Sequence, residues 1–109
     1  MEPLREIRNR LLNGWQLSKM HTFEVAARHQ SFALAAEELS LSPSAVSHRI
    51  NQLEEELGVT LFIRGKGSLM LTPEGEIVLK YARRIKALYG KMETEIDNSR
   101  KQLTKVRIG

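Results

Sequence analysis

The run Ser40-Leu41-Ser42-Pro43 constrains the fold most, because it ends one helix and starts the next within four residues. Ser42 can cap the following helix, and Pro43 suits its first position, where a missing N–H costs nothing. Gly58 then ends that helix, as glycine commonly does at the left-handed position past a helix. The apolar residues of this helix recur at helical spacing and are expected to be buried: Val46, Ile50, Leu53 and Leu57.

Two further helices are expected upstream of this run. The first begins near Ser18, which can cap it, and the second follows Ser31, another residue suited to capping. The short helix after Ser31 and the longer one after Ser42, joined by a turn of about three residues, are typical of a helix-turn-helix. Their apolar positions predict the buried faces: Met20, Phe23, Ala26 and Ala27 in the first helix, and Phe32, Ala35, Ala36 and Leu39 in the second.

After Gly58 the apolar periodicity changes from about 3.6 to about 2. Residues 61–64 and 68–71 are predicted strands, and Lys66 lies between Gly65 and Gly67 at the tip that joins them. The sequence therefore predicts a two-stranded wing beside the helices. The expected fold class is mainly α, a winged helix-turn-helix of three helices and a two-stranded wing.

A long C-terminal helix is predicted to follow the wing. Thr72 can cap it, Pro73 suits its first position, and Glu74 lies near the positive end of its dipole. An apolar stripe along this helix could simply pack on the core. The core helices are much shorter, however, so the long helix must overhang, and a second copy would cover the overhang most economically. The expected dimer interface is Ile77, Tyr81, Ile85, Leu88, Met92 and Ile96.

Composition excludes several classes of function. The 109 residues suffice for one domain, and 41% hydrophobic with 28% charged residues is a globular balance. There is no cysteine, so disulfides and thiolate metal sites are excluded. Neither MEPLREIRNRLLNGW nor any later stretch has the apolar run of a signal peptide or a membrane span, and we expect a cytoplasmic protein without membrane contact.

An enzyme is not expected either. The three histidines, His21, His29 and His48, lack metal-ligand spacing, and the chain has no nucleophile motif or glycine-rich phosphate loop. We therefore predict no catalytic residues, no metal and no cofactor.

The formal net charge of +4 permits nucleic-acid binding without establishing it. Residues 81–109 carry eight basic and three acidic residues, whereas residues 31–58 carry Arg49 against five glutamates. Because the predicted helix-turn-helix is net acidic, the argument for DNA has to rest on particular side chains.

One face of the predicted helix after Ser42 has the chemistry that DNA contacts need. Opposite the apolar stripe lie Ser44, His48, Asn51 and Glu55, with Ser47 and Arg49 on the flanks. Hydroxyl, imidazole and amide groups can contact phosphates and base edges without excluding the helix from a major groove, and the helix N-terminus offers N–H groups to a phosphate. We assign base-edge roles to His48 and Asn51, with Ser44 near them, and phosphate contacts to Ser42, Ser47 and Arg49.

The wing adds two basic residues. Lys66 suits a phosphate or minor-groove contact, and the equal alternative is a surface lysine that only aids solubility. Arg64 either reaches the DNA backbone or covers the edge of the hairpin. Taken singly, each polar residue would be an ordinary solvent-facing group, but with the capped turn and the wing they indicate a DNA-binding surface. The full predicted set is Ser31, Ser42, Pro43, Ser44, Ser47, His48, Arg49, Asn51, Arg64 and Lys66.

The run SFALAAEELSLSPSAVSHRINQLEEELGVTLFIR, followed by LTPEG and a long helix, resembles the N-terminal DNA-binding domain of LysR-type transcriptional regulators. The resemblance covers about residues 17–109. It implies a homodimer that binds palindromic promoter sites, a linker helix that dimerises, and a C-terminal domain, absent here, that binds a small-molecule effector. The ending LTKVRIG resembles the first strand of that domain. Residues 1–58 are most similar to a family member that acts in D-serine catabolism, and that closer likeness weakens from Val59 onward.

Four positions depart from the residues usual in this family. The family usually has an arginine at the positions of Leu34 and His48, a glutamine at that of Pro43, and often a basic residue at that of Gly67. These departures bear on the base contacts rather than on the fold, and Lys66 can replace the missing wing charge.

We therefore divide the chain into a helical extension (1–16), the winged helix-turn-helix (17–72), the linker or dimerisation helix (73–103) and the start of an effector-binding domain (104–109). The expected function is sequence-specific binding of double-stranded DNA as a homodimer, to regulate transcription. The alternative is a protein-interaction module, a coiled-coil dimer whose winged core docks on a protein partner.

Overall fold

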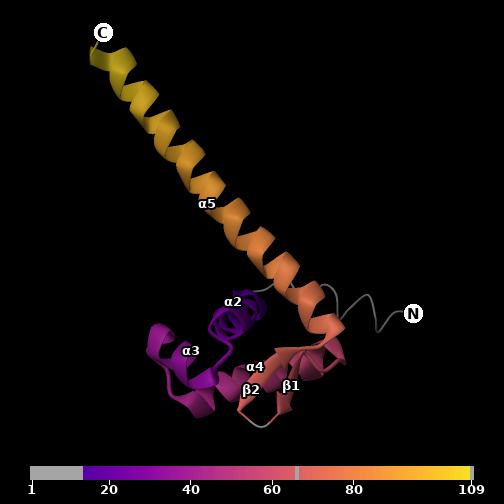
Figure 1. Cartoon of the computed structure of the whole chain (residues 1–109). Coiled ribbons are helices and arrows are strands. Elements are labelled where there is room, and N and C mark those ends of the chain that lie inside the picture. Colours follow the sequence, from indigo (N-terminus) through magenta and orange to yellow (C-terminus); the bar gives the residue numbers. More distant parts are fainter. Residues whose placement is uncertain (1–13, 66, 109) are drawn as a thin grey trace.

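The computed structural model describes residues 14–65 and 67–108, with side chains up to Gln102. Within this part of the chain, three helices and a hairpin form one body, from which a fourth and much longer helix projects (Figure 1). This arrangement confirms the expected winged helix-turn-helix with a long C-terminal helix. The elements are α2 (Gly14–His29), α3 (Phe32–Leu39), α4 (Pro43–Leu57), β1 (Phe62–Gly65), β2 (Ser68–Leu71) and α5 (Pro73–Ile108).

The core lies where α2, α3 and α4 meet the base of the hairpin. Phe23, Val46 and Ile50 are completely buried, and the predicted apolar stripes of these helices face this core. Phe62 of β1 packs on Phe23, with ring centroids 5.1 Å apart, and meets Phe32 edge to face at 5.6 Å. The aromatic contacts therefore anchor the hairpin to both α2 and α3.

The turn between α3 and α4 is built as the sequence predicts. Ser31 Oγ accepts a hydrogen bond from Leu34 N at the start of α3, and Ser42 Oγ accepts one from Ala45 N at the start of α4, each at 3.1 Å. Between them Ser40 adopts the left-handed conformation, with φ of 56°. The two serine caps satisfy N–H groups that a helix start leaves without partners, so local sequence alone defines this turn.

The wing is a two-stranded antiparallel hairpin that pairs Phe62 with Leu71 and Gly65 with Ser68. Its first strand begins one residue later than predicted, because Leu61 turns fully into the core instead of joining the strand. Gly67 has a φ of 75°, a left-handed conformation that glycine adopts without strain. Lys66, the predicted wing contact, lies outside the described residues.

The wing runs directly into α5 through Thr72. Its Oγ1 accepts a hydrogen bond from Gly75 N at 2.9 Å and donates one to Thr60 O at 2.6 Å. Thr72 N also donates to Leu61 O at 3.0 Å. Thr72 therefore caps α5 as predicted and, in addition, ties the cap to the segment that leads into β1.

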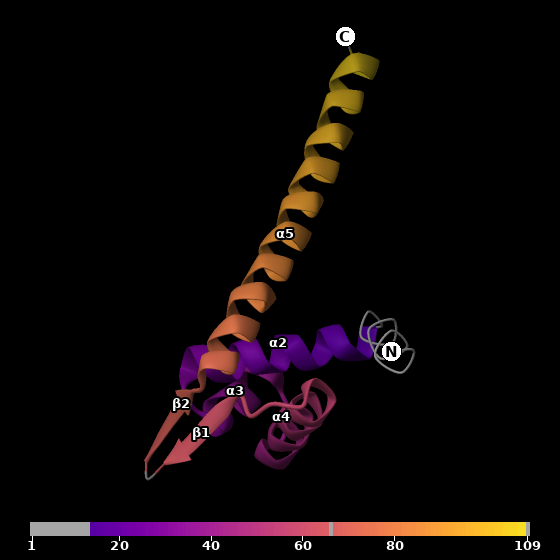
Figure 2. The same cartoon turned by 90° about the vertical axis from the view of Figure 1, so that its right-hand side faces the viewer.

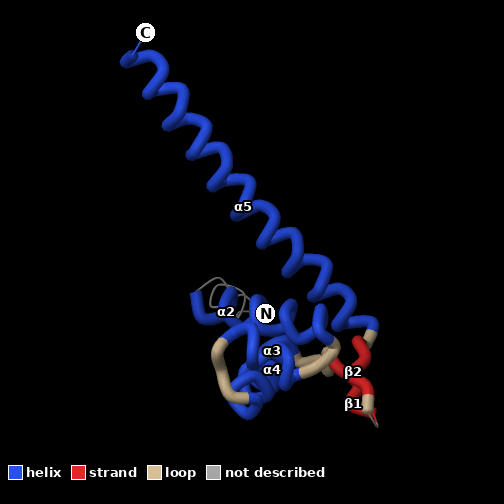
Figure 3. Tube along the Cα trace, turned by 60° about the vertical axis from the view of Figure 1, so that its left-hand side comes forward, coloured by secondary structure: helices blue, strands red, loops and turns tan. Residues whose placement is uncertain are grey.

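The helix α5 packs on the core only through its first turns, where Leu79 and Ala82 are buried. Beyond them it projects away from the body, and its free end points away from the hairpin tip in both perpendicular views (Figures 1 and 2). The tube in Figure 3 shows the same arrangement, with the strands beside the start of α5. This overhang was expected, although at 36 residues the helix is longer than predicted.

Three details differ from the sequence-based expectations. The first core helix begins at Gly14, so Ser18 lies inside α2 and does not cap it; Thr22 Oγ1 donates to the carbonyl oxygen of Ser18. Leu57 is 37% exposed because it lies in the last turn of α4, at the rim of a groove between α2 and α5. Residues 104–108 continue α5 rather than forming a strand, since a helix satisfies its own backbone groups while a strand needs a partner.

The predicted N-terminal extension falls largely on residues 1–13, which lie outside the described part; Trp15 and Gln16 belong to α2. Within the described residues, no helix combines the length and the apolar character that crossing a membrane requires.

Candidate nucleic-acid interface

The outward face of α4 carries the residues predicted to read DNA. Ser44, His48 and Asn51 are exposed along successive turns, on the side opposite the buried Val46 and Ile50. No acidic residue occupies the first turn of α4. The face is therefore a neutral, polar strip that starts at the positive end of the helix dipole, where an anion is stabilised.

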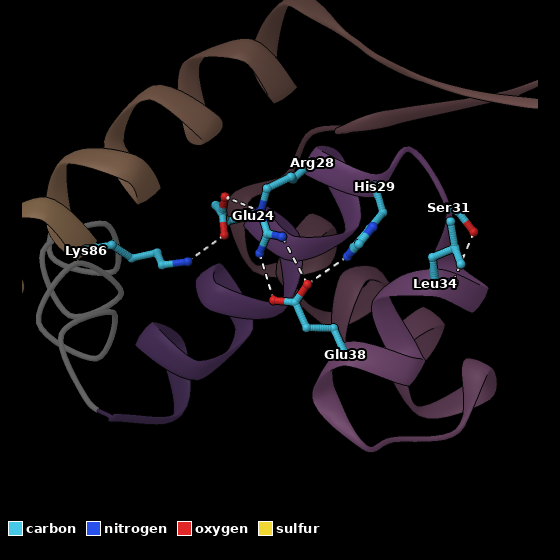
Figure 4. Close-up of polar contacts among 7 residues, drawn as sticks. All are labelled: Glu24, Arg28, His29, Ser31, Leu34, Glu38 and Lys86. Carbon is cyan, nitrogen blue, oxygen red and sulfur yellow. Dashed lines mark hydrogen bonds and ion pairs between the residues drawn. The ribbon is translucent and has the colours of Figure 1, made fainter.

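The start of α4 presents a compact group of hydroxyls. Ser42 and Ser44 are exposed, and their Oγ atoms lie 3.2 Å apart. Pro43 is exposed between them, whereas Ser47, one turn further along, is only half-exposed. Ser31 holds the equivalent place at the start of α3, where Figure 4 shows it beside Leu34. The structure thus brings Ser42 and Ser44 together at the start of α4, whereas Ser31 lies at the start of the preceding helix.

Arg49 is placed differently from the other predicted contacts. Its Nη1 donates to Ser18 Oγ and to Thr22 Oγ1, both at 3.3 Å, and its guanidinium lies 5.5 Å from the ring centroid of Trp15. These partners all belong to α2. The structure therefore turns Arg49 toward α2 and away from the strip of Ser44, His48 and Asn51, and its phosphate contact remains a prediction.

Asn51 and Arg64 are joined directly. Arg64 Nη2 donates to Asn51 Oδ1 at 2.9 Å, and the Arg64 guanidinium lies 5.1 Å from the ring centroid of Phe32. Arg64 thus links β1 to α3 and α4, and both of its predicted roles, a contact to the DNA backbone or cover for the hairpin edge, remain predictions. The sequence did not predict this pairing, because nothing in the spacing of residues 51 and 64 indicates it.

The glutamates of α4 have mostly structural partners. Glu54 Oε2 accepts hydrogen bonds from Leu61 N at 2.7 Å and from Phe62 N at 3.4 Å. Glu56 bonds Lys19 Nζ at 2.7 Å and also Gln16 of α2. Burial alone would raise the pKa of Glu56, but these hydrogen bonds outweigh it and hold the pKa below its ordinary value. Of the three, only Glu55 extends the outward strip, at the end distant from the serines.

A second set of ion pairs ties the helices together away from this strip (Figure 4). The buried Glu24 bonds Lys86 of α5 at 2.7 Å and Arg28 at 3.4 Å. Burial would raise the pKa of Glu24, but the hydrogen bonds from Lys86 and Arg28 outweigh it and lower that pKa. Hydrogen bonds from Arg28 and then His29 lower the pKa of Glu38 to about 2. Arg28 bonds both carboxylates, while Lys86 bonds only Glu24 and His29 only Glu38, so the set links α2 to α3 and α5.

The predicted dimer stripe on α5 is exposed in the single chain. Ile77 is 54% exposed, Leu88 65% and Ile96 46%, whereas the helix face turned to the core carries Leu79 and Ala82. The chain's own core therefore covers the stripe only in part, and its role as a dimer interface remains a prediction. Near the core, the stripe borders an apolar groove of 170 Å³ between α2, α4 and α5, lined in part by Met20, Leu57, Ile77 and Tyr81.

The family pattern described as "Bacterial regulatory helix-turn-helix protein, lysR family" matches residues 17–76. The chain is 85% identical over 78 residues to the HTH-type transcriptional regulator DsdC of Escherichia coli K12, a match covering 72% of this chain and 25% of that protein. This match is longer than 58 residues, so the likeness continues past Gly58. The Glycine cleavage system transcriptional activator of the same organism is 52% identical over 60 residues, 55% of this chain and 20% of that protein. The chain thus spans about a quarter or less of the length of these curated relatives.

Solved structures give the same result for the fold. "BenM_DBD/catB site 1 DNA Complex" matches with a TM-score of 0.71 and 32% identity, over 75% of this chain and 91% of that chain. "CbnR_DBD-DNA complex" matches with a TM-score of 0.68 and 29% identity, over 76% of this chain and 95% of that chain. Both neighbours were solved with DNA.

Proposed function

Because the chain belongs to the LysR family of bacterial helix-turn-helix regulators and carries its DNA-binding domain, we propose that it binds a palindromic promoter site as a homodimer. In this proposal α4 enters the major groove and α5 provides the dimer interface. The relatives are transcriptional regulators rather than enzymes, which agrees with the chemistry of the site.

The observation that carries the proposal is the outward strip of α4. A B-DNA major groove about 12 Å wide admits a helix whose facing side chains are small enough to let it approach the bases. Ser44, His48 and Asn51 meet that requirement over about two turns, and each can form a hydrogen bond with a base edge or a phosphate. The capped starts of α3 and α4 add backbone N–H groups suited to phosphates.

A dimer is supported by the part of α5 that leaves the core. Beyond Lys86 no described side chain of the helix is buried, yet Leu88, Met92 and Ile96 continue one apolar line. Such a line is covered when a second α5 packs along it. Two recognition helices related by a two-fold axis would then read half-sites separated by about one helical turn, or a multiple of it.

We extend the proposal to the longer protein implied by the relatives. The chain matches 25% of DsdC. In the longer protein that we propose, the part beyond this match would hold the domain that binds a small-molecule effector. The resemblance to a regulator of D-serine catabolism leads us to propose control of such genes in the bacterial cytoplasm.

The test is a fluorescence anisotropy titration of a duplex from the promoter region of its gene, against a scrambled duplex, across a salt series. We expect tighter binding to the promoter duplex at physiological salt, with log K falling by about 0.9 per phosphate contacted for each decade of salt. If both duplexes bind equally and this binding is lost as the salt concentration rises, the chain alone binds DNA only through electrostatic attraction. No binding at low salt would overturn the proposal in favour of a protein-docking module.

Two substitutions test the division of roles. His48→Ala should reduce discrimination between the promoter and scrambled duplexes, because a base contact is lost. Lys66→Ala should weaken binding to all duplexes about equally, because a phosphate contact carries no sequence information. Identical behaviour of the two variants would contradict the assignment.

The dimer is tested separately by sedimentation equilibrium. Leu88→Glu places a charge on the exposed apolar line and should shift the chain to a monomer. Ala87→Glu introduces the same charge at an exposed position off that line, and should leave the mass unchanged. If both variants sediment as dimers, α5 does not form the interface through this line.

A further inference from the structure

We propose that Arg64 sets the base preference of Asn51, by bonding its side-chain carbonyl oxygen so that the NH₂ donors face the DNA. This inference rests on the proposed function and concerns one base pair of the site. Arg64 is a positioning residue in this proposal, because it acts through Asn51.

The chemistry of the pair fixes the orientation of the Asn51 amide. The two atoms that meet at 2.9 Å are Arg64 Nη2 and Asn51 Oδ1. A guanidinium has five N–H donors and no acceptor, so only the oxygen of an amide can face it. The amide of Asn51 therefore turns its NH₂ group away from Arg64.

Arg64 is itself held in place by neighbours outside α4. Its guanidinium lies over the ring of Phe32, 5.1 Å from the centroid, and Phe32 in turn packs edge to face on Phe62. In the hairpin Arg64 pairs with Leu69. Because α3, the wing and the aromatic core all constrain Arg64, the oxygen of Asn51 is engaged before any DNA arrives.

The consequence is a change in the base that Asn51 prefers. An unrestrained asparagine binds adenine through two bonds, since its oxygen accepts from N6 and its NH₂ donates to N7. The oxygen keeps a second lone pair, but the cationic donors of Arg64 beside it oppose the approach of the N6 amino group of adenine, so Asn51 offers mainly its own NH₂ donors. In the major groove, guanine presents two adjacent acceptors, N7 and O6, whereas adenine presents an N6 donor beside its N7. The geometry therefore favours guanine over adenine opposite Asn51.

The experiment selects duplexes from a library randomised across the promoter site and compares base frequencies for four proteins. Asn51→Ala identifies the position that Asn51 reads, as the one whose preference disappears. Arg64→Met removes the donor while keeping an unbranched stem near Phe32, and Arg64→Lys keeps a donor-only group. Thermal unfolding of each variant reports whether the fold is retained.

We expect the wild-type chain to prefer guanine over adenine at that position by roughly tenfold, the size of one good base contact. Arg64→Met should abolish or reverse this preference and leave the other positions unchanged, while Arg64→Lys should retain it. A wild-type preference for adenine, or an unchanged ratio in Arg64→Met, would overturn the inference.

A measurement without DNA separates this inference from the proposed function. In nuclear magnetic resonance spectra, the side-chain amide signals of Asn51 should shift in Arg64→Met and stay near their wild-type positions in Arg64→Lys. If the wild type binds no duplex, the proposed function fails, whereas absence of the amide shift shows that the pair does not exist.

Discussion

Replacing Gly75 by alanine should destabilise the fold, although alanine is normally the better residue inside a helix. A Cβ built at Gly75 would lie 2.2 Å from Leu61 O, 3.2 Å from Leu61 C and 3.0 Å from Leu71 Cδ2. The closest of these atoms belongs to the backbone and cannot rotate away. Leu61 O also accepts from Thr72 N at 3.0 Å, and Leu61 N donates to Glu54 Oε2 at 2.7 Å. Hydrogen bonds therefore hold both the N–H and the carbonyl group of Leu61, the residue that a Cβ at Gly75 would meet.

The size of the effect follows from three contributions. Relieving the clash requires α5 to move from the core by nearly an ångström, and such overpacking costs about 1–3 kcal/mol. The movement also lengthens the Thr72–Leu61 and Thr72–Thr60 hydrogen bonds, worth about 1 kcal/mol each when lost. The helix preference of alanine offsets about 1 kcal/mol. If both bonds are lost, the net loss is about 2–4 kcal/mol.

Thermal and urea unfolding, followed by circular dichroism at one protein concentration, measures this loss. A loss of 1 kcal/mol lowers Tm by about 4–8 °C in a domain of this size, so the expected decrease is readily resolved. Gly90→Ala is the matched control, since Gly90 lies in the same helix and a Cβ there meets nothing within 4 Å. It should raise stability by up to about 1 kcal/mol. A Gly75→Ala variant as stable as the wild type would refute the reasoning.

Three further predictions use other contacts. Glu54→Ala should cost about 1–3 kcal/mol in urea unfolding, because it leaves Leu61 N without its acceptor; Glu54→Gln, which keeps an acceptor, should cost less. The pKa of Glu38 is lowered to about 2 from 4.5, so its ion pairs stabilise the fold above pH 4.5 and this contribution is lost as pH falls toward 2; an NMR titration should show that pKa rising in Arg28→Ala. Arg49→Met should lower stability by about 1 kcal/mol and leave the salt slope of DNA binding unchanged, since Arg49 bonds α2; a slope reduced by about one unit would establish a phosphate contact.

Local rules predicted most of the fold. Serine caps, the proline at the first position of α4 and the apolar periods depend on residues only a few positions apart, and they located α3, α4 and the wing to within a residue or two. Capping chemistry at Ser18 predicts a helix start there, whereas α2 runs through Ser18 from Gly14.

Contacts between distant segments account for what the sequence could not predict. The approach of Gly75 to Leu61, and the bond from Arg64 to Asn51, depend on how α5 and β1 lie against the other elements. Neither has a periodic signal. The glycine after Thr72-Pro73-Glu74 was the one available hint, because a glycine in the first turn of a helix calls for a packing reason.

The distribution of charge on α4 shows why a count of charges misjudges this domain. The helix carries one basic and three acidic residues, which would repel DNA if all of them faced it. Arg49 and Glu56 instead bond α2, and Glu54 bonds the backbone that leads into β1. Only Glu55 continues the outward strip, at its far end. The outward strip is thus close to neutral because the core and the wing hold the other charges. In the proposed complex, attraction to phosphates would come from helix N-termini and the wing, while α4 would discriminate among bases.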